Sequence, residues 1–145
     1  MQPVPYLFFR GTAAEALRAY ARVFGAPEPD IMLMGSLPED QRMGAGPDAV
    51  MHGAVKVDQG WIYASDDQDA SKAGGCVAVT QRTADESRRI FDALAEGGQV
   101  TMPISRTFWS PAFGMLTDRW GTRWMIDTEG APQAQAASEP ATETA

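Results

Sequence analysis

The sequence contains one cysteine and one histidine in 145 residues. A single cysteine cannot close an intramolecular disulfide, and a site with two histidine ligands cannot be assembled within one copy of the chain. No positively charged, apolar and cleavable leader opens the sequence, so we expect a cytoplasmic protein. Apolar runs are short, since none approaches the roughly 20 residues that a membrane-spanning helix requires. We therefore expect a soluble protein with no membrane partner.

Positive charge is also scarce. The chain has 12 Lys and Arg residues against 19 Asp and Glu residues, which gives a formal net charge of -7. Proteins that bind nucleic acids use clustered Lys and Arg to displace counterions from the phosphates. We therefore expect no nucleic-acid partner. A small anionic ligand is not excluded, because a pocket can carry a local arginine within a negative surface.

Large side chains are missing from the C-terminal stretch. From Gly130 onward there is no aromatic residue and no aliphatic residue larger than alanine. Such a composition cannot bury enough apolar surface to offset the entropy that ordering would cost. We predict that residues 130–145 form a disordered extension.

Two helix-start signals of the same kind occur in the rest of the chain. They are the capping boxes Thr12-Ala13-Ala14-Glu15 and Thr83-Ala84-Asp85-Glu86. In a capping box the threonine hydroxyl accepts a backbone N–H bond and the glutamate reaches back to the N–H of the cap. Apolar residues at helical spacing follow each box until Gly25 and Gly97. The repetition predicts two helices in corresponding positions of two similar halves.

Each predicted helix lies within a similar series of predicted strands. One short apolar strand precedes the helix, and three strand candidates separated by Gly, Pro or Asp follow it. The predicted strands are residues 6–9, 30–34, 50–57 and 61–65, then 76–80, 100–105, 114–117 and 123–127. We predict an α+β fold in which two tandem βαβββ modules form curved antiparallel sheets around a cleft, with the helices outside. We place the modules at about residues 3–66 and 74–128 of one domain spanning residues 1–129.

One connection in the first half differs from the short turns elsewhere. Residues 35–48 contain several glycine and proline residues and show little periodicity. We predict that they form the most mobile loop of the domain.

The second half carries the most specific resemblance to known proteins. Its helix ends in Phe91-Asp92-Ala93-Leu94-Ala95-Glu96-Gly97-Gly98, and Phe113-Gly114-Met115-Leu116-Thr117-Asp118-Arg119-Trp120-Gly121 follows. With Met51-His52-Gly53 and Ala64-Ser65-Asp66, these strings resemble the PhnB-like branch of the vicinal-oxygen-chelate superfamily, which contains glyoxalases, bleomycin-resistance proteins and dioxygenases. The resemblance covers roughly residues 3–128 and implies paired βαβββ modules in a homodimer.

Members of this branch often carry the label 3-demethylubiquinone 3-methyltransferase. A nucleotide-derived cofactor in a doubly wound sheet requires a Gly-rich turn between a strand and a helix, with an acidic residue downstream. This sequence has no such turn. We therefore expect neither methyl transfer nor a cofactor.

Metal-dependent relatives place His or Glu ligands on facing strands of the two modules, where a divalent ion polarises vicinal oxygens of the substrate. The resemblance puts those positions at Pro5, Tyr63, Cys76 and Met125. None of these is a good ligand for a hard metal ion, and Cys76 alone cannot make a stable site. We expect no metal site within a protomer, while a site shared across a dimer stays open.

His52 is the remaining candidate for chemistry. Strand alternation in residues 50–57 places it on the face opposite to the one that packs on the helix. A neutral imidazole there can hydrogen-bond a ligand oxygen or act as a catalytic general base. The alternative is a structural histidine satisfied by a neighbouring Ser or Asp, and the sequence leaves both open.

The further candidates for ligand binding are mostly aromatic. Trp61, Tyr63 and Ser65 share one strand face and can form an aromatic wall with polar handles, although Trp61 also suits ordinary core packing. Phe108 and Trp109 are costly to expose, so they should cover a cleft or a partner subunit. Arg123 can bind a carboxylate or phosphate in a forked geometry, or pair with a nearby aspartate.

Two other features are interpreted as structural. Asp66, Asp67 and Asp69 follow a strand in a polar run, which is typical of a solvated turn. Cys76 lies in an apolar run with nothing cationic in the adjacent sequence, so we expect a buried packing residue and no nucleophile.

Our leading hypothesis is a metal-free protein that binds a small, partly aromatic or oxygen-rich ligand in a cleft lined by His52, Tyr63 and Trp109. One alternative is a metal-dependent enzyme of the glyoxalase or dioxygenase kind. Another is an interaction protein whose cleft is vestigial. The crowding of Phe108, Trp109, Phe113, Met115 and Trp120 in one stretch favours a homodimer with the cleft near the interface.

Overall fold

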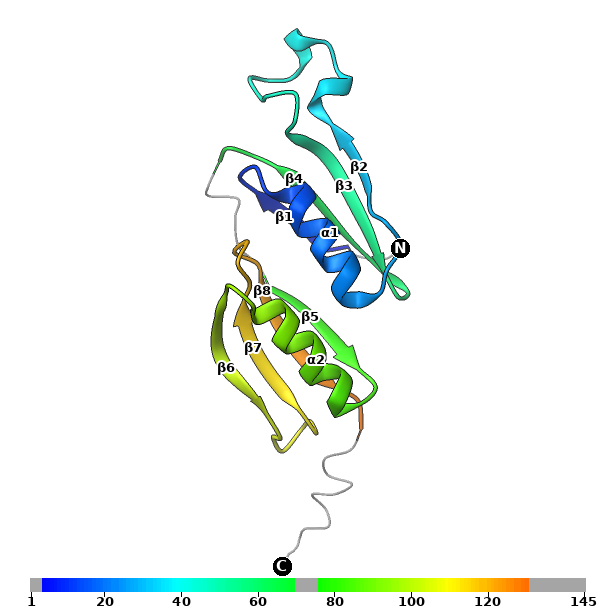
Figure 1. Ribbon diagram of the computed structural model, residues 1–145, viewed down its shortest axis with the longest axis vertical. Coiled ribbons are helices and arrows are strands. Elements are labelled where there is room, and N and C mark those ends of the chain that lie inside the picture. The colour runs from blue at the N-terminus through cyan, green and yellow to red at the C-terminus, as the bar shows by residue number, and fades with distance from the viewer. Residues whose placement is uncertain (1–3, 70–75, 131–145) are drawn as a thin grey trace, which may run out of the picture. The chain divides into compact units, whose positions relative to one another are not determined.

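The computed structural model describes residues 4–69 and 76–130. The chain divides into two compact units, Met1–Gly75 and Cys76–Ala145, and each has one helix against a four-stranded sheet (Figure 1). The disordered extension predicted for residues 130–145 lies outside the described residues, except for Gly130. No helix within the described ranges is long and apolar enough to cross a membrane.

The first unit follows the predicted β-α-β-β-β order. Its elements are β1 (Tyr6–Phe9), α1 (Ala13–Phe24), β2 (Asp30–Leu33), β3 (Val50–Val57) and β4 (Gly60–Asp66). The strands lie side by side in the order β1-β4-β3-β2.

The second unit repeats this arrangement. Its elements are β5 (Cys76–Gln81), α2 (Ala84–Ala95), β6 (Gln99–Ser105), β7 (Phe113–Thr117) and β8 (Arg123–Thr128). The strand order is β5-β8-β7-β6, which is the order of the first unit. The predicted α+β fold with two βαβββ modules is confirmed.

Each sheet is mixed, because one parallel pair of strands lies beside the predicted antiparallel pairs. β1 pairs with β4 in parallel, and β5 pairs with β8 in parallel, while the other pairs are antiparallel. The helix returns the chain to its starting end, so that β2 runs in the direction of β1. Two hairpin reversals then give β4 that same direction.

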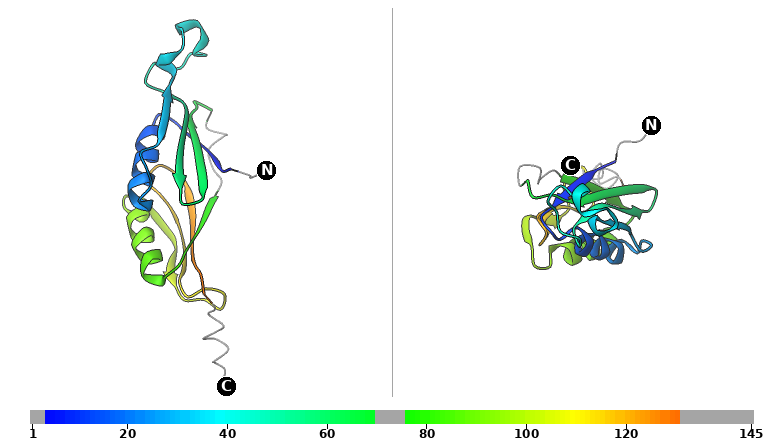
Figure 2. Two further views of the ribbon diagram at one scale, coloured as in Figure 1. Left: turned by 90° about the vertical axis from the view of Figure 1, so that its right-hand side faces the viewer. Right: turned by 90° about the horizontal axis from the view of Figure 1, so that it is seen from above.

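Each helix covers one face of the sheet in its own unit (Figure 2). On α1 the side chains of Ala16, Leu17 and Tyr20 are fully buried. Gly53 of β3 lies beneath Leu17, and a Cβ at this position would collide with the Leu17 side chain. The second unit uses Gly114 of β7 in the same way, since a Cβ there would lie 2.7 Å from the Phe91 ring of α2. Glycine in the third strand therefore lets each helix pack closely.

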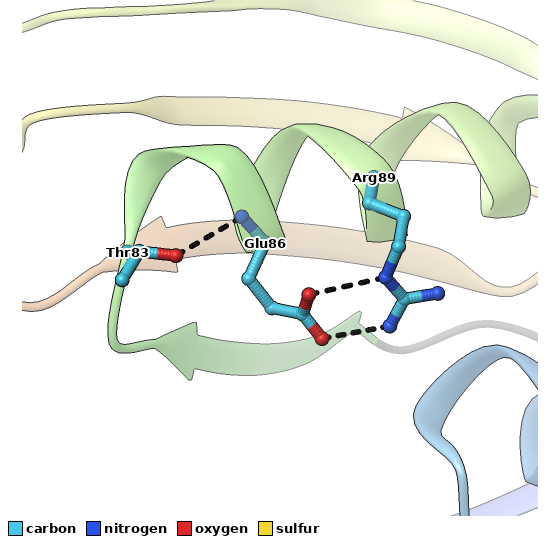
Figure 3. Close-up of polar contacts among 3 residues, drawn as sticks. All are labelled: Thr83, Glu86 and Arg89. Atoms are coloured by element: carbon cyan, nitrogen blue, oxygen red, sulfur yellow. Dashed lines mark hydrogen bonds and ion pairs between the residues drawn. The ribbon is translucent and has the colours of Figure 1, made fainter.

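The two predicted capping boxes differ from the observed helix starts. In the second unit the Thr83 hydroxyl accepts a hydrogen bond from the Glu86 backbone N–H at 3.2 Å, as predicted. The Glu86 carboxylate, however, binds the Arg89 guanidinium, at 2.7 Å in the shorter contact (Figure 3). The hydrogen bond from Arg89 lowers the pKa of Glu86 below its ordinary value. Thr12 in the first unit makes no side-chain capping bond.

Asp66, at the end of β4, takes over the capping of α1. One carboxylate oxygen accepts the backbone N–H groups of Gly11 and Ala13 at 2.9 and 3.0 Å, and the other accepts that of Val50 at 2.9 Å. The expectation of a solvated turn is therefore wrong for this residue. Its charge lies beside the positive end of the helix dipole, and its two oxygens join β4, α1 and β3.

The corresponding strand end in the second unit has a neutral residue. Thr128 ends β8, and its buried hydroxyl lies 2.6 Å from that of Ser87 on α2 and donates to the Ala112 carbonyl at 2.7 Å. Ala112 directly precedes β7, as Ala49 directly precedes β3. Both units thus join the end of the last strand to the helix and to the start of the third strand.

The loop between β2 and β3 contains local hydrogen-bonded structure, and its predicted mobility stays a prediction. It extends beyond the ends of both strands (Figure 1) and contains two short 3-10 turns, Met34–Ser36 and Glu39–Gln41. Backbone N–H groups of Met34 and Gly35 donate across the loop to Ala49 and Pro47, each at 2.8 Å. These bonds hold the two sides of the loop together.

Replacing Asp66 by alanine should lower the free energy of unfolding by about 2–3 kcal/mol, because three backbone N–H groups lose a charged acceptor. Urea denaturation measures this change. Asp40→Ala is a matched control that removes the same charge from an exposed 3-10 turn. Equal stability of the Asp66→Ala and Asp40→Ala variants would contradict the joining role of Asp66.

Candidate functional site

The first unit carries an aromatic cluster on the face of its sheet that points away from α1. His52 on β3 precedes Gly53, which faces the helix, so its imidazole points to the opposite side as predicted. Four further rings lie on that side and surround it. We call this set the His52 cluster: Tyr6, Phe8, His52, Trp61 and Tyr63.

The contacts within the His52 cluster are close. The imidazole meets the Tyr63 ring edge-on, with centroids 5.0 Å apart, and the Tyr6 ring at 5.8 Å. The Tyr6 hydroxyl lies 3.3 Å from Nδ1 of His52. Trp61 stands 6.3 Å from Tyr63 and has the Lys56 ammonium 6.0 Å from its ring centroid. Phe8 stands 5.0 Å from Tyr6 at the other side of the cluster.

Tyr6 and Phe8 are residues that the sequence interpretation did not assign to ligand binding. The parallel register of β1 and β4 brings Tyr6 opposite Tyr63 and Phe8 opposite Ser65. Alternation along residues 6–9 places Tyr6 and Phe8 on one face, but only the pairing of β1 with β4 shows that this face is shared with Tyr63. A prediction of antiparallel sheets could not supply that neighbour.

The Tyr6 contact links the chemistry of His52 to its tautomer. If the Tyr6 hydroxyl donates to Nδ1, the neutral ring carries its proton on Nε2 and can donate to a ligand oxygen. If Nδ1 carries the proton and donates to Tyr6, Nε2 is a free acceptor and can serve as a general base. Tyr6 therefore replaces the Ser or Asp partner that a structural histidine was expected to have.

Ser65 and Trp61 differ in their accessibility. Ser65 is 7% exposed and lies in register with Phe8, so little of its surface is accessible to a ligand. Trp61 is half-buried and in contact with the Tyr63 ring, so it belongs to the edge of the His52 cluster. The predicted polar handle at Ser65 stays a prediction.

Phe108 and Trp109 lie on an ordered turn of the second unit. The Thr107 hydroxyl accepts the backbone N–H groups of Trp109 and Ser110 at 3.3 and 3.1 Å. Phe108 is 81% exposed and Trp109 is 44% exposed, and the Trp109 ring packs on Phe113 at 5.3 Å. Trp120 lies beyond the other end of β7, where Arg119 covers its ring at 4.5 Å. These residues, with Met115, are thus distributed over β7 and the segments at both of its ends.

Arg123 lies at the start of β8, in register with Cys76 of β5. Cys76 is exposed, so the expectation that it is buried is wrong. Strand pairing is the reason, because β5 is an edge strand and Cys76 points away from the face that Val77 buries. Three methionines occupy one cross-strand row on the same face of this sheet: Met102, Met115 and Met125.

Two of the positions to which the resemblance assigns metal ligands are Tyr63 and Met125. Tyr63 and Met125 lie in the fourth strand of their units, each on the face away from the helix. Within residues 4–69 and 76–130, no three His, Cys, Asp or Glu side chains form a group that could hold a metal ion. His52 lies in the first unit and Trp109 in the second, and their meeting in one cleft stays a prediction.

Comparison with known proteins agrees with the fold and the motifs. The model of the family described as 3-demethylubiquinone-9 3-methyltransferase matches residues 2–127. The chain is 32% identical over 135 residues to protein YjdN of Escherichia coli K12, covering 85% of this chain and 92% of that protein.

Solved structures give the same result. Protein PA1353 from Pseudomonas aeruginosa is 36% identical with a TM-score of 0.78, over 89% of this chain and 98% of that one. A PhnB protein from Bacillus cereus, described as a putative 3-demethylubiquinone-9 3-methyltransferase, shares the fold with a TM-score of 0.72 at 22% identity, over 89% of this chain and 100% of that one. A member of the glyoxalase/bleomycin resistance protein/dioxygenase superfamily from Sphaerobacter thermophilus shares the fold with a TM-score of 0.51 at 18% identity, over 89% and 98%. This chain therefore belongs to the PhnB-like family that is described as 3-demethylubiquinone-9 3-methyltransferase, and it has the vicinal-oxygen-chelate fold.

Proposed function

We propose that this protein binds a small aromatic or oxygen-bearing molecule on the open face of the first sheet, and that it does so without a metal ion. The observation that supports the proposal best is the His52 cluster. It combines aromatic surface for packing with an imidazole and two phenol hydroxyls for orientation, which is the usual composition of a ligand site.

The cluster has features that suit a planar ligand. Tyr6 is 41% exposed although its ring is large and apolar, and its neighbours His52 and Tyr63 are half-buried. A ligand ring could pack against these edges, since offset and edge-to-face contacts between aromatic rings are favourable. The imidazole would then hydrogen-bond an oxygen of the ligand, with Tyr6 holding the tautomer.

Methyl transfer is not part of the proposal, although the family description names it. Both sheets are mixed, and each has one helix on one face. A doubly wound sheet that holds a nucleotide-derived cofactor has parallel strands with helices on both faces. The geometry therefore gives no support for such a cofactor site.

Aromatic alcohols, ketones and carboxylates should shift the ring NMR signals of His52 when they bind. The assignment is unambiguous because the chain has one histidine. Tyr63→Ala should weaken the binding of any such compound by about tenfold or more, because aromatic packing against the ligand is lost. Tyr63→Phe should retain most of it.

A half-buried aromatic on the helix supplies the control, since Phe24→Ala removes a ring from α1 and should leave binding unchanged. Compounds that bind elsewhere and leave the His52 signals in place would count against this site.

Purified protein should bind no transition metal tightly within a protomer. Pro5, Tyr63, Cys76 and Met125 supply no set of hard ligands, and a stable divalent site needs three or four donors. Calorimetric titration with Zn, Ni, Mn and Fe(II) tests this expectation. A submicromolar site that His52→Ala abolishes would falsify it and favour the metal-dependent enzyme.

We also propose that the protein forms a homodimer that covers Phe108 and Trp109. The observation in favour is the exposure of both rings on a turn that Thr107 already holds in place. Rigid, exposed aromatic residues are typical of the centre of protein interfaces. Cytoplasmic location stays a prediction from composition alone.

Trp109→Ala should weaken self-association and shift the protein towards monomer at low concentration, because the ring would leave the interface. Light scattering coupled to size exclusion measures the mass. Trp120→Ala changes the same residue type at the other end of β7 and should leave the mass unaltered. A wild-type protein that stays a folded monomer at about micromolar concentration would rule out an obligate dimer.

A further inference from the structure

The first unit contains a cavity on a different part of its surface from the His52 cluster. It has a volume of about 310 Å³ and lies where the loop between β2 and β3 meets the end of β4. That volume is at the lower end of the roughly 300–1,000 Å³ range of small-molecule pockets. The side chains that matter for its chemistry are Met34, Arg42, Met43, Asp66, Asp67 and Gln68.

The wall formed by the loop is held in place by its own hydrogen bonds. Gly35 donates to Pro47 across the base of the loop at 2.8 Å, and Ala45 donates to Arg42 at 2.9 Å. A Cβ at position 35 would lie 2.9 Å from the Pro47 carbonyl oxygen, so glycine permits this close approach. The cavity is therefore formed before any ligand binds.

Arg42 is the positive group of the cavity. Its side chain is half-buried, and its Nε donates to the Leu37 carbonyl at 3.0 Å, which fixes the plane of the guanidinium. Among residues 4–69 and 76–130, no carboxylate forms an ion pair with Arg42. Its two terminal nitrogens thus keep the donors with which arginine binds a carboxylate in a forked geometry.

The lining that comes from the end of β4 and the residues after it is negative. Asp66 accepts three backbone N–H bonds, and Asp67 accepts the Asp69 backbone N–H at 2.8 Å. One arginine and two aspartates give the lining a formal charge that repels a simple anion. A ligand with both a carboxylate and an ammonium group would complement the charges of Arg42 and of the aspartates.

The apolar part of the cavity is formed by two methionines. Met34 is buried, whereas Met43 is 87% exposed and has a φ of 53°, a left-handed conformation that is unfavourable for its side chain. Residues held in sparsely populated backbone conformations cluster at functional sites. Methionine adapts well to apolar ligands of irregular shape.

We propose that this cavity binds an apolar α-amino acid. Arg42 would bind the carboxylate, Asp67 the ammonium group, and Met34 and Met43 the aliphatic side chain. The proposal is independent of the His52 cluster, since the two sites share no residue.

The test uses L-leucine as the probe and methyl NMR of the methionines as the readout, in the full chain. L-leucine should shift the Met34 and Met43 signals in a saturable manner and leave those of Met102 and Met115 in place. Isocaproate lacks the ammonium group and isoamylamine lacks the carboxylate, so each should bind at least about tenfold more weakly than L-leucine. Absence of saturable binding, or equal binding of the three compounds, would overturn the proposal.

Variants then separate the roles of the side chains. Arg42→Gln and Asp67→Asn should each weaken L-leucine binding by about tenfold or more, while Arg42→Lys should retain part of it because the charge remains. Arg88→Gln on the exposed surface of α2 is the matched control and should bind as the wild type does. Met43→Gly should weaken binding without lowering thermal stability, since glycine accepts the left-handed backbone. Wild-type affinity in folded Arg42→Gln protein would overturn the assignment of the carboxylate, and with it the proposal.

Discussion

The arrangement of the first unit depends on the hydrogen bonds that the Asp66 carboxylate accepts. Its two oxygens bind backbone N–H groups at the start of α1 and at the start of β3, while its own residue ends β4. These three elements are far apart in the sequence, so the contact fixes how the helix lies over the sheet. Both candidate ligand sites follow from that arrangement, because the His52 cluster lies on the face that α1 leaves open and the loop cavity lies beside Asp66 itself.

In the second unit, neutral hydroxyl groups join the corresponding three elements. Thr128 and Ser87 join the end of β8 to α2, and Thr128 also reaches the residue before β7. The backbone plan of the two units is therefore the same, whereas the chemistry at corresponding places differs. The open face of the first sheet has an imidazole among aromatic rings, and that of the second has a row of methionines. A duplicated fold thus gives two surfaces suited to different contacts.

The turn between β7 and β8 is also held by a single aspartate that accepts several N–H groups. Asp118 accepts the backbone N–H groups of Trp120 and Thr122, and it also accepts the indole N–H of the fully buried Trp124 at 2.9 Å. The side chain is 3% exposed, and a buried carboxylate is stable only when its oxygens are bonded. Its bonds hold the β7–β8 hairpin, which has Phe113, the contact of Trp109, at its open end and Trp120 in its turn.

Local sequence signals were enough to predict the order of the elements in both units. Helical periodicity, glycine stops and short apolar runs are local signals, and they predicted two βαβββ modules and the side of β3 on which His52 lies. Local signals cannot say which distant strand becomes a neighbour. The parallel pairing of β1 with β4, and with it the place of Tyr6 beside His52, therefore came only from the tertiary structure.

The prediction that Thr12 caps α1 was wrong for the same reason. The Thr12 box is a local pattern, but Asp66 is a charged acceptor brought to the helix start by the fold, and a charged acceptor binds backbone N–H groups more strongly than a hydroxyl does. The exposure of Cys76 was likewise decided by an edge position in the sheet, and the cavity beside Arg42 by hydrogen bonds across an aperiodic loop. Sequence patterns determine elements and their faces, whereas contacts between residues far apart in the chain decide which side chains meet.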